Sequence, residues 1–470
     1  MKKSRLYEVF ESLSQPELKE LRKFVRSPFF NQRGHVVALF DFLEQARKNR
    51  GPVDRQLAFA HLWPGIPFDD HKLRLSMSLL LKTIEQYLIW QQANRSSVAS
   101  ELLLLSAFKE RGLERHFQRS ARRLDERLER QSLRDATYYQ YRYQLHLERY
   151  QFNSRQNRMK GIPLEEVQTN FDIAYLAAKL KQSCLMLSHQ AIYNKAYDFG
   201  MLIEALAFIE RQGYLKYPAI SVYYYAYQAL TGQKEQDSFA IFKSLIFEYQ
   251  GLFPKDDIRD LFLLATNYCI QKLNQGHQRF AREGLDIYQE GLKKELLLQQ
   301  GRLSNFTYSN IVAKAIVCKE FEWAGGFIES YRHLLAPSIQ ASSYAYNLAW
   351  LKYEQKDYDA AMELLQRSHF SDTLLSLSAK TIALKIYFEL EAFELLSSHL
   401  DAMRSFLNRK KLLAYHRQNY ANTIKYTKKI LDLPPYASQQ RLLLQEEIRA
   451  TAAIAEKKWL LRQIAPKESA

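Results

Sequence analysis

Turn-forming residues are scarce in this sequence of 470 residues. It contains 15 glycines and 12 prolines, well below the average usage of about 7% and about 5%. Sheets with many short strands need many tight turns, and glycine and proline form most of these turns. Long helices with short connections need the fewest turns, so the sequence predicts an all-α fold.

Cysteines are also few, and no two of them lie close together in the sequence. Cys184, Cys269 and Cys318 lie far apart in apolar helical stretches. They form none of the spacings that are typical of zinc sites or redox motifs. We therefore expect buried thiols in a reducing compartment.

Long uncharged apolar runs are missing as well. The basic start of the chain is followed by Arg5, Glu8 and Glu11 instead of the apolar stretch of a signal peptide. No segment of the sequence approaches the roughly 18 uncharged apolar residues that indicate a membrane span. We expect a cytoplasmic protein.

Sequence signatures of catalysis and of metal or cofactor binding are absent. The chain has no glycine loop for phosphate, no Gly-x-Ser-x-Gly turn, no His-Glu-x-x-His motif and no calcium loop. None of the 11 histidines follows a glutamate by three residues, which excludes the Glu-x-x-His pattern of di-iron bundles. The sequence therefore predicts a protein that is not an enzyme and holds no cofactor.

Aromatic side chains and positive charge are abundant. The 30 tyrosines and 27 phenylalanines suit helices that interleave bulky side chains between layers. The net charge of +16 and the pI of about 9.4 favour acidic partners such as nucleic acid, acidic protein segments or an anionic membrane surface. The alternative is a set of charged, solvated helix faces.

Chain length and periodicity indicate more than one hydrophobic core. A single core stops growing at roughly 250 to 300 residues, so this chain forms several domains or an elongated stack. Residues 4–93 have the pattern of a helical head, in which Ser14 is a typical N-cap before Pro16 and Glu17. A long helix with one broad apolar face is expected over residues 70–90.

The head helix at residues 70–90 has two interpretations. It follows a short helix and a turn, which is the order of a helix-turn-helix motif, and Lys72 and Arg74 lie near the start of the helix that would contact DNA. The connecting residues 63–69 contain two prolines and exceed the usual three or four residues. Plain helical packing is the other interpretation.

The densest run of arginines lies at residues 111–134. Arginine suits phosphate because its planar fork donates two parallel hydrogen bonds, and a row of forks along a helix would follow a nucleic-acid backbone. Glutamates such as Glu126 are interleaved one turn away, so a locally neutralised, solvated face is the alternative. The candidate face for nucleic acid or another acidic partner consists of Arg115, Arg119, Arg122, Arg123, Arg127 and Arg130.

Helical hairpins are expected throughout residues 97–433. A polar and basic stretch at residues 153–163 marks a soft boundary within them, because it ends in a glycine and a proline. A further amphipathic helix is expected over residues 437–464. It would cap the stack, whose last hairpin otherwise leaves an apolar face in water.

The hairpin at residues 345–365 resembles a tetratricopeptide repeat. Leu348-Ala349 takes the place of Leu-Gly in the repeat, Asp357-Tyr358 the place of the turn, and Ala361 the place of the small packing residue. Lys352 stands where the repeat has tyrosine, and Thr373 where it has proline. The resemblance extends over residues 306–407, because Phe321, Tyr358 and Phe393 recur at intervals of 37 and 35 residues.

This resemblance implies an α-solenoid of antiparallel helical hairpins. In such proteins the first helices of the hairpins line a groove that holds an extended peptide or a partner helix. The resemblance would place Tyr346, Trp350, Tyr353 and Lys385 at this groove. An aromatic stripe with this spacing is also the pattern of a buried helix face, which is the alternative.

These observations favour a non-enzymatic protein-binding scaffold that uses the groove of a helical-repeat solenoid. The alternative is a nucleic-acid-binding protein that uses the head helix at residues 70–90 and the arginine-rich face at residues 111–134. The partner is accordingly an unidentified protein or peptide, or nucleic acid. The sequence does not determine the oligomeric state.

Overall fold

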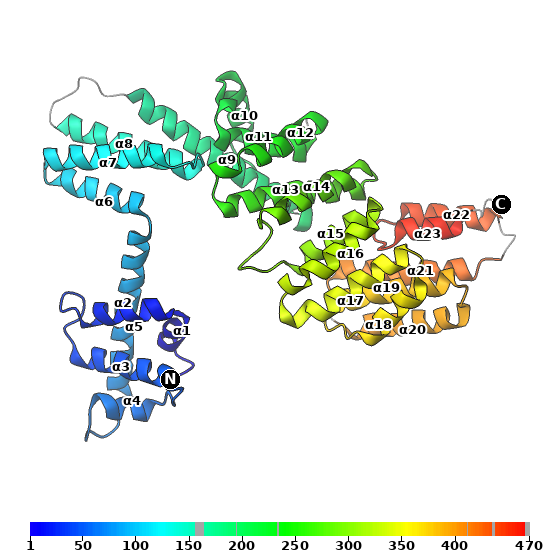
Figure 1. The fold of residues 1–470 in the computed structure, drawn as a ribbon, viewed down its shortest axis with the longest axis horizontal. Coiled ribbons are helices and arrows are strands. Elements are labelled where there is room, and N and C mark those ends of the chain that lie inside the picture. The colour runs from blue at the N-terminus through cyan, green and yellow to red at the C-terminus, as the bar shows by residue number, and fades with distance from the viewer. Residues whose placement is uncertain (156–163, 194, 233–234, 411, 435–437, 466–470) are drawn as a thin grey trace. The chain divides into compact units, whose positions relative to one another are not determined.

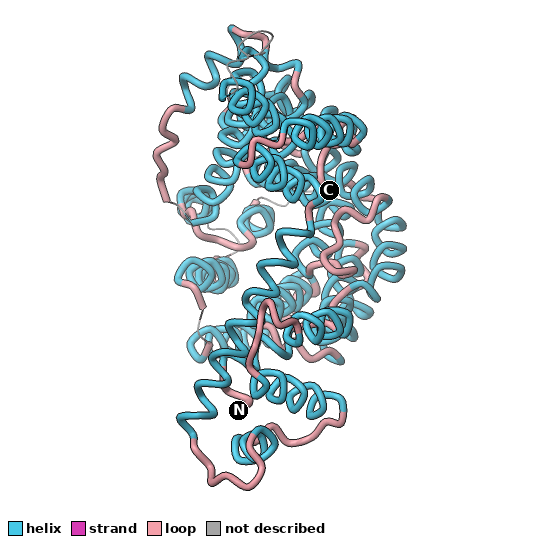
Figure 2. The backbone as a smooth tube through the Cα atoms, turned by 90° about the vertical axis from the view of Figure 1, so that its left-hand side faces the viewer, coloured by secondary structure: helices cyan, strands magenta, loops and turns pink. Residues whose placement is uncertain are grey.

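The regular secondary structure of the described residues is helical. The computed structural model describes residues 1–155, 164–193, 195–232, 235–410, 412–434 and 438–465. In these ranges there are 23 α-helices and three short 3-10 helices, no strand, and one isolated β-bridge between Gln299 and Arg302. Figure 2 shows the helices joined by loops. The all-α prediction is confirmed.

Contacts between residues divide the chain into two units. The first comprises residues 1–182 and 199–221, and the second comprises residues 183–198 and 222–470. Residues 156–163 lie outside the described residues, so most of the soft boundary predicted at residues 153–163 has no structural description.

The first unit contains the helices from α1 to α8, α10, and parts of α9 and α11. In chain order these elements are α1 (Arg5–Ser12), α2 (Gln15–Arg26), α3 (Gly34–Lys48), α4 (Arg55–Leu62), α5 (Asp70–Arg95), α6 (Ser97–Glu110), α7 (Glu114–Arg130), α8 (Ala136–Arg155), α9 (Leu164–Tyr193), α10 (Leu202–Arg211), the 3-10 helix η1 (Tyr214–Lys216) and α11 (Pro218–Thr231).

Helices α1 to α5, blue in Figure 1, share one apolar core. Helix α5 contacts each of the four others and buries one face, which includes Leu80 and Ile84. Ser14 caps α2 as predicted. The Glu17 backbone N–H donates to Ser14 Oγ at 3.4 Å, and the Ser14 N–H donates to the Glu17 carboxylate at 2.7 Å. This reciprocal pair satisfies two N–H groups that the helix leaves free.

The second unit contains the remaining helices, from α12 to α23. In chain order they are α12 (Glu235–Glu248), η2 (Gln250–Leu252), α13 (Lys255–Asn274), α14 (Arg279–Lys293), α15 (Asn305–Val317), α16 (Phe321–Tyr331), η3 (Arg332–Leu334), α17 (Pro337–Glu354), α18 (Tyr358–Arg367), α19 (Thr373–Glu389), α20 (Phe393–Arg409), α21 (Ala414–Leu431), α22 (Ser438–Ala450) and α23 (Lys457–Ile464). Each helix from α13 to α20 packs against the next one or two along the chain.

One turn geometry recurs between α15 and α16, α17 and α18, and α19 and α20. Its central residues, Lys319, Lys356 and Glu391, have left-handed φ values of 60°, 64° and 54°. In each turn the following N–H donates at 2.9 Å to a carbonyl five residues earlier, which closes the end of the first helix. The three residues lie 37 and 35 residues apart, so the backbone repeats with the period found in the sequence.

The single helix predicted over residues 437–464 is wrong. The structure has two helices, α22 and α23, separated by six residues. Asn422 Nδ2 donates to the Ala453 carbonyl at 2.8 Å, and Lys457 Nζ donates to the Thr451 carbonyl at 3.0 Å. Ile454 between them is buried. These hydrogen bonds give the backbone carbonyls of Thr451 and Ala453 partners outside a helix. Residues 451–456 therefore stay non-helical although three of them are alanines, which have the highest helix propensity.

Among the described residues, every helix is either too short or too polar to cross a bilayer.

Candidate functional site

The residues that the tetratricopeptide resemblance would place at a groove lie together in the second unit. Tyr346 and Trp350 on α17 are half-buried, with ring centroids 6.1 Å apart. Tyr353 on α17 and Lys385 on α19 are only 6% and 7% exposed. All but Lys385 belong to an apolar cluster built around Ala361 and Ile386.

Polar contacts hold the buried pair. The Tyr353 hydroxyl donates to the Glu389 carboxylate at 2.5 Å, and both burial and this hydrogen bond raise the pKa of Tyr353. Lys385 Nζ lies 2.6 Å from the Glu456 carboxylate and 5.5 Å from the centre of the Tyr353 ring. These contacts favour the packing interpretation of the aromatic stripe, because the two side chains face other parts of the same unit and not an open groove.

The six arginines of the candidate acidic-partner face lie on α7, which packs against α6 and α8 in the first unit. Arg123 forms an ion pair with Glu101, Arg127 lies 3.6 Å from the same carboxylate, and Arg130 lies 3.8 Å from Glu126. Half of the predicted face is therefore neutralised.

Arg115, Arg119 and Arg122 are exposed on the side of α7 that faces away from its buried residues. Within the described residues none of these three guanidinium groups has a carboxylate partner. Arg119 and Arg122 line a shallow depression together with Gln118, Arg123 and Glu126. The nearby Asp125 pairs instead with arginines of α8, so part of the positive charge of α7 stays uncompensated.

The start of the head helix carries little of the chemistry needed for reading DNA. Arg74 pairs with Asp70 at 2.7 Å within α5, and Lys72 Nζ lies 4.4 Å from the centre of the Trp63 ring. These contacts engage both basic side chains within the head, which favours plain helical packing over a helix-turn-helix role.

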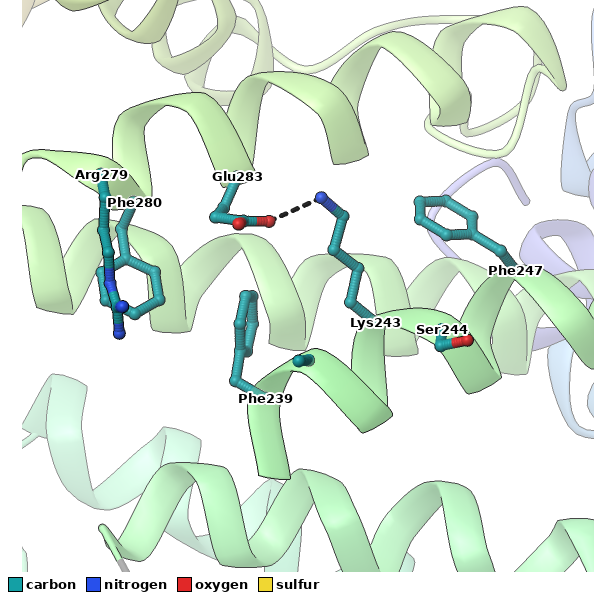
Figure 3. A pocket seen from close by; sticks show the side chains of 8 residues that line it. Phe239, Lys243, Ser244, Phe247, Arg279, Phe280 and Glu283 are labelled. Carbon is teal, nitrogen blue, oxygen red and sulfur yellow. Dashed lines mark hydrogen bonds and ion pairs between the residues drawn. The ribbon is translucent and has the colours of Figure 1, made fainter. Parts of the chain in front are cut away.

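An open groove lies between α12 and α14 of the second unit (Figure 3). The groove continues toward the C-terminal end of α14, and Lys243 and Phe247 of α12 line both of its parts. The lining residues are Phe239, Ala240, Lys243, Ser244 and Phe247 of α12, and Arg279, Phe280, Glu283, Asp286, Gln289, Glu290 and Lys293 of α14.

Helical periodicity explains why α12 presents these side chains together. Phe239, Lys243 and Phe247 are spaced by four residues, which places them one above the other on one helix face. The Phe239 ring stacks on Tyr268 of α13 with centroids 4.6 Å apart and meets the edge of Phe280 at 5.6 Å. Phe239 and Phe280 are almost fully buried, so they form a rigid apolar base.

Charged groups divide the groove along its length. Lys243 Nζ crosses from α12 to reach Glu283 at 2.6 Å and Asp286 at 3.4 Å, and Figure 3 shows the first of these pairs. At the other end, the Arg279 guanidinium lies 4.8 Å from the centre of the Phe280 ring. It is exposed and has no carboxylate partner among the described residues. The groove thus offers an aromatic base beside one uncompensated cation.

Sequence reasoning treated α12 and α14 only as packing elements and missed this groove. The available signal was the four-residue spacing of Phe239, Lys243 and Phe247. The same spacing also occurs on fully buried helix faces. Only the open space between α12 and α14 in the structure shows that this face of α12 lines a groove.

Comparisons with known proteins give no assignment for this arrangement. No family model matches the chain, no curated protein is similar to it, and no solved structure matches it. In the part of the chain that the structure describes, no three histidine, cysteine, aspartate or glutamate side chains are grouped as metal ligands.

Proposed function

We propose that this protein is a non-enzymatic protein-binding scaffold whose groove between α12 and α14 holds a segment of a partner protein. The observation that carries this proposal is the combination of an apolar aromatic base with the unpaired Arg279 in an open groove. Aromatic residues and arginine are both enriched at protein interfaces relative to the rest of the surface. The net charge of +16 favours an acidic partner at long range.

We further propose that the helical pairs form an α-solenoid of tetratricopeptide-like hairpins. Two observations support this architecture. The turns at Lys319, Lys356 and Glu391 share one geometry, and α17 contacts α15 and α19 in addition to its own partner α18. Contacts of this kind are the ones that stack successive hairpins in repeat proteins.

The chemistry of the groove defines the expected ligand. A carboxylate of the ligand would pair with Arg279, and a nearby apolar side chain of the ligand would pack against Phe247, which is half-buried. Lys243 is already paired with Glu283 and Asp286. A carboxylate of the ligand would therefore bind less strongly at Lys243 than at Arg279.

Reversing the charge at Arg279 tests the scaffold proposal. The full chain is used to retain partners from a nuclease-treated extract of its native cells near physiological salt. We expect a discrete protein whose retention by Arg279→Glu falls about tenfold or more, because a carboxylate then faces a carboxylate. The matched control is Arg404→Glu, an exposed arginine on α20 outside the groove, which should retain the partner fully. Equal retention by Arg279→Glu and wild type would contradict the proposal.

The alternative function is nucleic-acid binding by α7. One observation favours it, namely the row of exposed and uncompensated Arg115, Arg119 and Arg122. Each phosphate contact contributes a slope of about −0.9 to the dependence of log affinity on log salt. Three contacts would therefore weaken binding about 40-fold between about 50 mM and 200 mM salt.

Fluorescence anisotropy with labelled single-stranded and duplex oligonucleotides tests this alternative. If α7 binds phosphate, Arg115→Glu with Arg119→Glu and Arg122→Glu should abolish the salt-dependent part of binding. The control carries the same charge change on exposed residues of the second unit, Lys255→Glu with Arg404→Glu and Lys458→Glu. If both triple variants bind alike, net charge and not α7 is responsible.

A further inference from the structure

The face of α19 that carries Lys385, one of the residues that the resemblance would place at a peptide groove, is covered by the chain itself. Residues 451–464, which include α23, lie on this face. Glu456 pairs with Lys385 of α19 at 2.6 Å, and the Trp459 indole N–H donates to Glu389 of α19 at 3.0 Å. The Ala453 carbonyl accepts from Asn422 of α21 at 2.8 Å. The segment therefore spans two successive helical pairs.

Apolar anchors accompany these polar contacts. Trp459, Leu460 and Ile464 of α23 are each at most 2% exposed, and Ile454 is 8% exposed. The Trp459 ring meets the edge of Phe388 with centroids 5.2 Å apart. The four side chains belong to a core that they share with α19, α20, α21 and the preceding α22. Binding therefore depends on a few inserted side chains, as it does for a peptide in a groove.

The segment depends on this face for its structure. Residues 451–456 are not helical, and α23 has only eight residues. Isolated helices shorter than about 12 residues are marginal in water, so α23 folds only while it is docked. A segment of this kind exchanges between a docked and a free state more readily than a helix in the middle of a bundle.

We propose that the face formed by α19 and α21 is a second peptide-binding surface, occupied within the chain by residues 451–464. The partner that replaces this segment is a peptide with an acidic residue three positions before a tryptophan-leucine pair. This surface shares no residue with the groove between α12 and α14.

The receptor side chains define that ligand chemistry. Lys385 is a buried cation and needs a carboxylate, which Glu456 supplies. Glu389 accepts hydrogen bonds from the hydroxyls of Tyr353 and Tyr358 at 2.5 Å each. Its third hydrogen bond comes from the indole N–H of Trp459. Phenylalanine is smaller than tryptophan and donates no hydrogen bond to Glu389, so the surface selects tryptophan.

Binding of the segment in trans tests the proposal. A fluorescent peptide with the sequence of residues 451–464 is titrated with the full chain and with its Trp459→Ala variant, after circular dichroism has shown both to be helical. Because the variant holds its own segment weakly, we expect it to bind the peptide about tenfold or more tighter than the wild type does. The same peptide with Trp459→Phe should bind weakly, and Arg279→Glu in the protein should change nothing. A folded Trp459→Ala chain that binds no peptide overturns the proposal.

Hydrogen exchange of the unaltered chain provides a second measurement, which needs no variant to fold. Amides of residues 457–464 should exchange through local opening, faster than those of residues 377–386 on α19. Glu456→Gln should accelerate exchange in α23 alone, whereas the control Glu446→Gln on the exposed face of α22 should not. Exchange of α23 at the same rate as α19 in all three proteins overturns the proposal, because the segment would then open only with the whole unit.

Discussion

Replacing Glu389 by alanine is expected to lower the free energy of unfolding of the second unit by about 3 kcal/mol. Glu389 lies at the end of α19 and accepts three hydrogen bonds, from Tyr353, Tyr358 and Trp459. Tyr353 and Trp459 are buried, so their donors find no water when the carboxylate is removed. Tyr358 is half-buried and is solvated more easily, which limits the total loss.

The protonation of Glu389 gives this prediction a pH dependence. Burial alone would raise its pKa, but the hydrogen bonds from Tyr353, Tyr358 and Trp459 outweigh burial and hold the pKa of Glu389 below its usual range. A carboxyl whose pKa is lower in the folded state stabilises the protein above its unfolded pKa of about 4.3. This contribution is lost as the pH falls through the lower folded pKa.

Urea unfolding at several pH values measures the effect. The difference between wild type and Glu389→Ala should be full near pH 7 and shrink below about pH 4.3. Glu363→Ala is the matched control, because Glu363 forms only an exposed pair with Arg367 one helical turn away. Such a pair contributes about 0.5 kcal/mol or less. A loss for Glu389→Ala no larger than that of the control would show that the three donors are satisfied elsewhere.

Replacing Lys314 by methionine is expected to raise the free energy of unfolding by about 2 kcal/mol near pH 7. Lys314 on α15 is 2% exposed, and no carboxylate partner for it is found among the described residues. The Lys314 Nζ lies 5.4 Å from the centre of the Tyr288 ring, which gives the ammonium a weak cation–π contact. Methionine has similar length and needs no counter-charge.

The packing around Lys314 explains why the lysine is tolerated. Gly284 in the middle of α14 has no side chain, and a Cβ atom there would collide with Cδ and Cε of Lys314. The glycine thus provides the channel in which the lysine stem lies. Burial lowers the pKa of Lys314 to about 8, because the charged ammonium is poorly solvated there.

The gain from Lys314→Met depends on pH in a defined direction. A lysine whose pKa is lower in the folded state than in the unfolded state destabilises the fold by a constant amount below the folded value of about 8. This penalty disappears as the pH rises from about 8 to the unfolded value of 10.5. The advantage of methionine should therefore be largest near pH 7 and shrink at alkaline pH.

Urea unfolding of Lys314→Met near pH 7 and above pH 9 checks this prediction. Lys293→Met is the control, since the Lys293 side chain is 74% exposed beside Glu290, and it should change stability little at either pH. A destabilised Lys314→Met would mean that the ammonium group has a stabilising partner in solution.

Local features of the fold could be predicted from the sequence. Ser14 was recognisable as a helix cap because its partner Glu17 lies three residues away. The period of 37 and 35 residues marked the turns at Lys319 and Lys356, although the left-handed backbone of lysine there has no distinct sequence signal. Caps, turns and apolar periodicity depend on neighbours within a few residues, so the sequence carries them directly.

The candidate surfaces were less predictable. The repeat pattern placed Tyr353 and Lys385 at one groove, and Lys385 Nζ lies 5.5 Å from the centre of the Tyr353 ring, but the pattern does not say what covers them. The groove between α12 and α14 was missed, because the spacing of Phe239, Lys243 and Phe247 is the same on a buried face and on an exposed one.

The sequence by itself determined that this protein is helical, where α2 begins and at what interval the turns at Lys319, Lys356 and Glu391 follow one another. The tertiary structure decided which aromatic and charged faces are open and which are filled. The physical reason is the range of the interactions. Trp459 completes the hydrogen bonds of Glu389 across 70 residues of chain, and a pairing of this kind exists only after separate helices have packed.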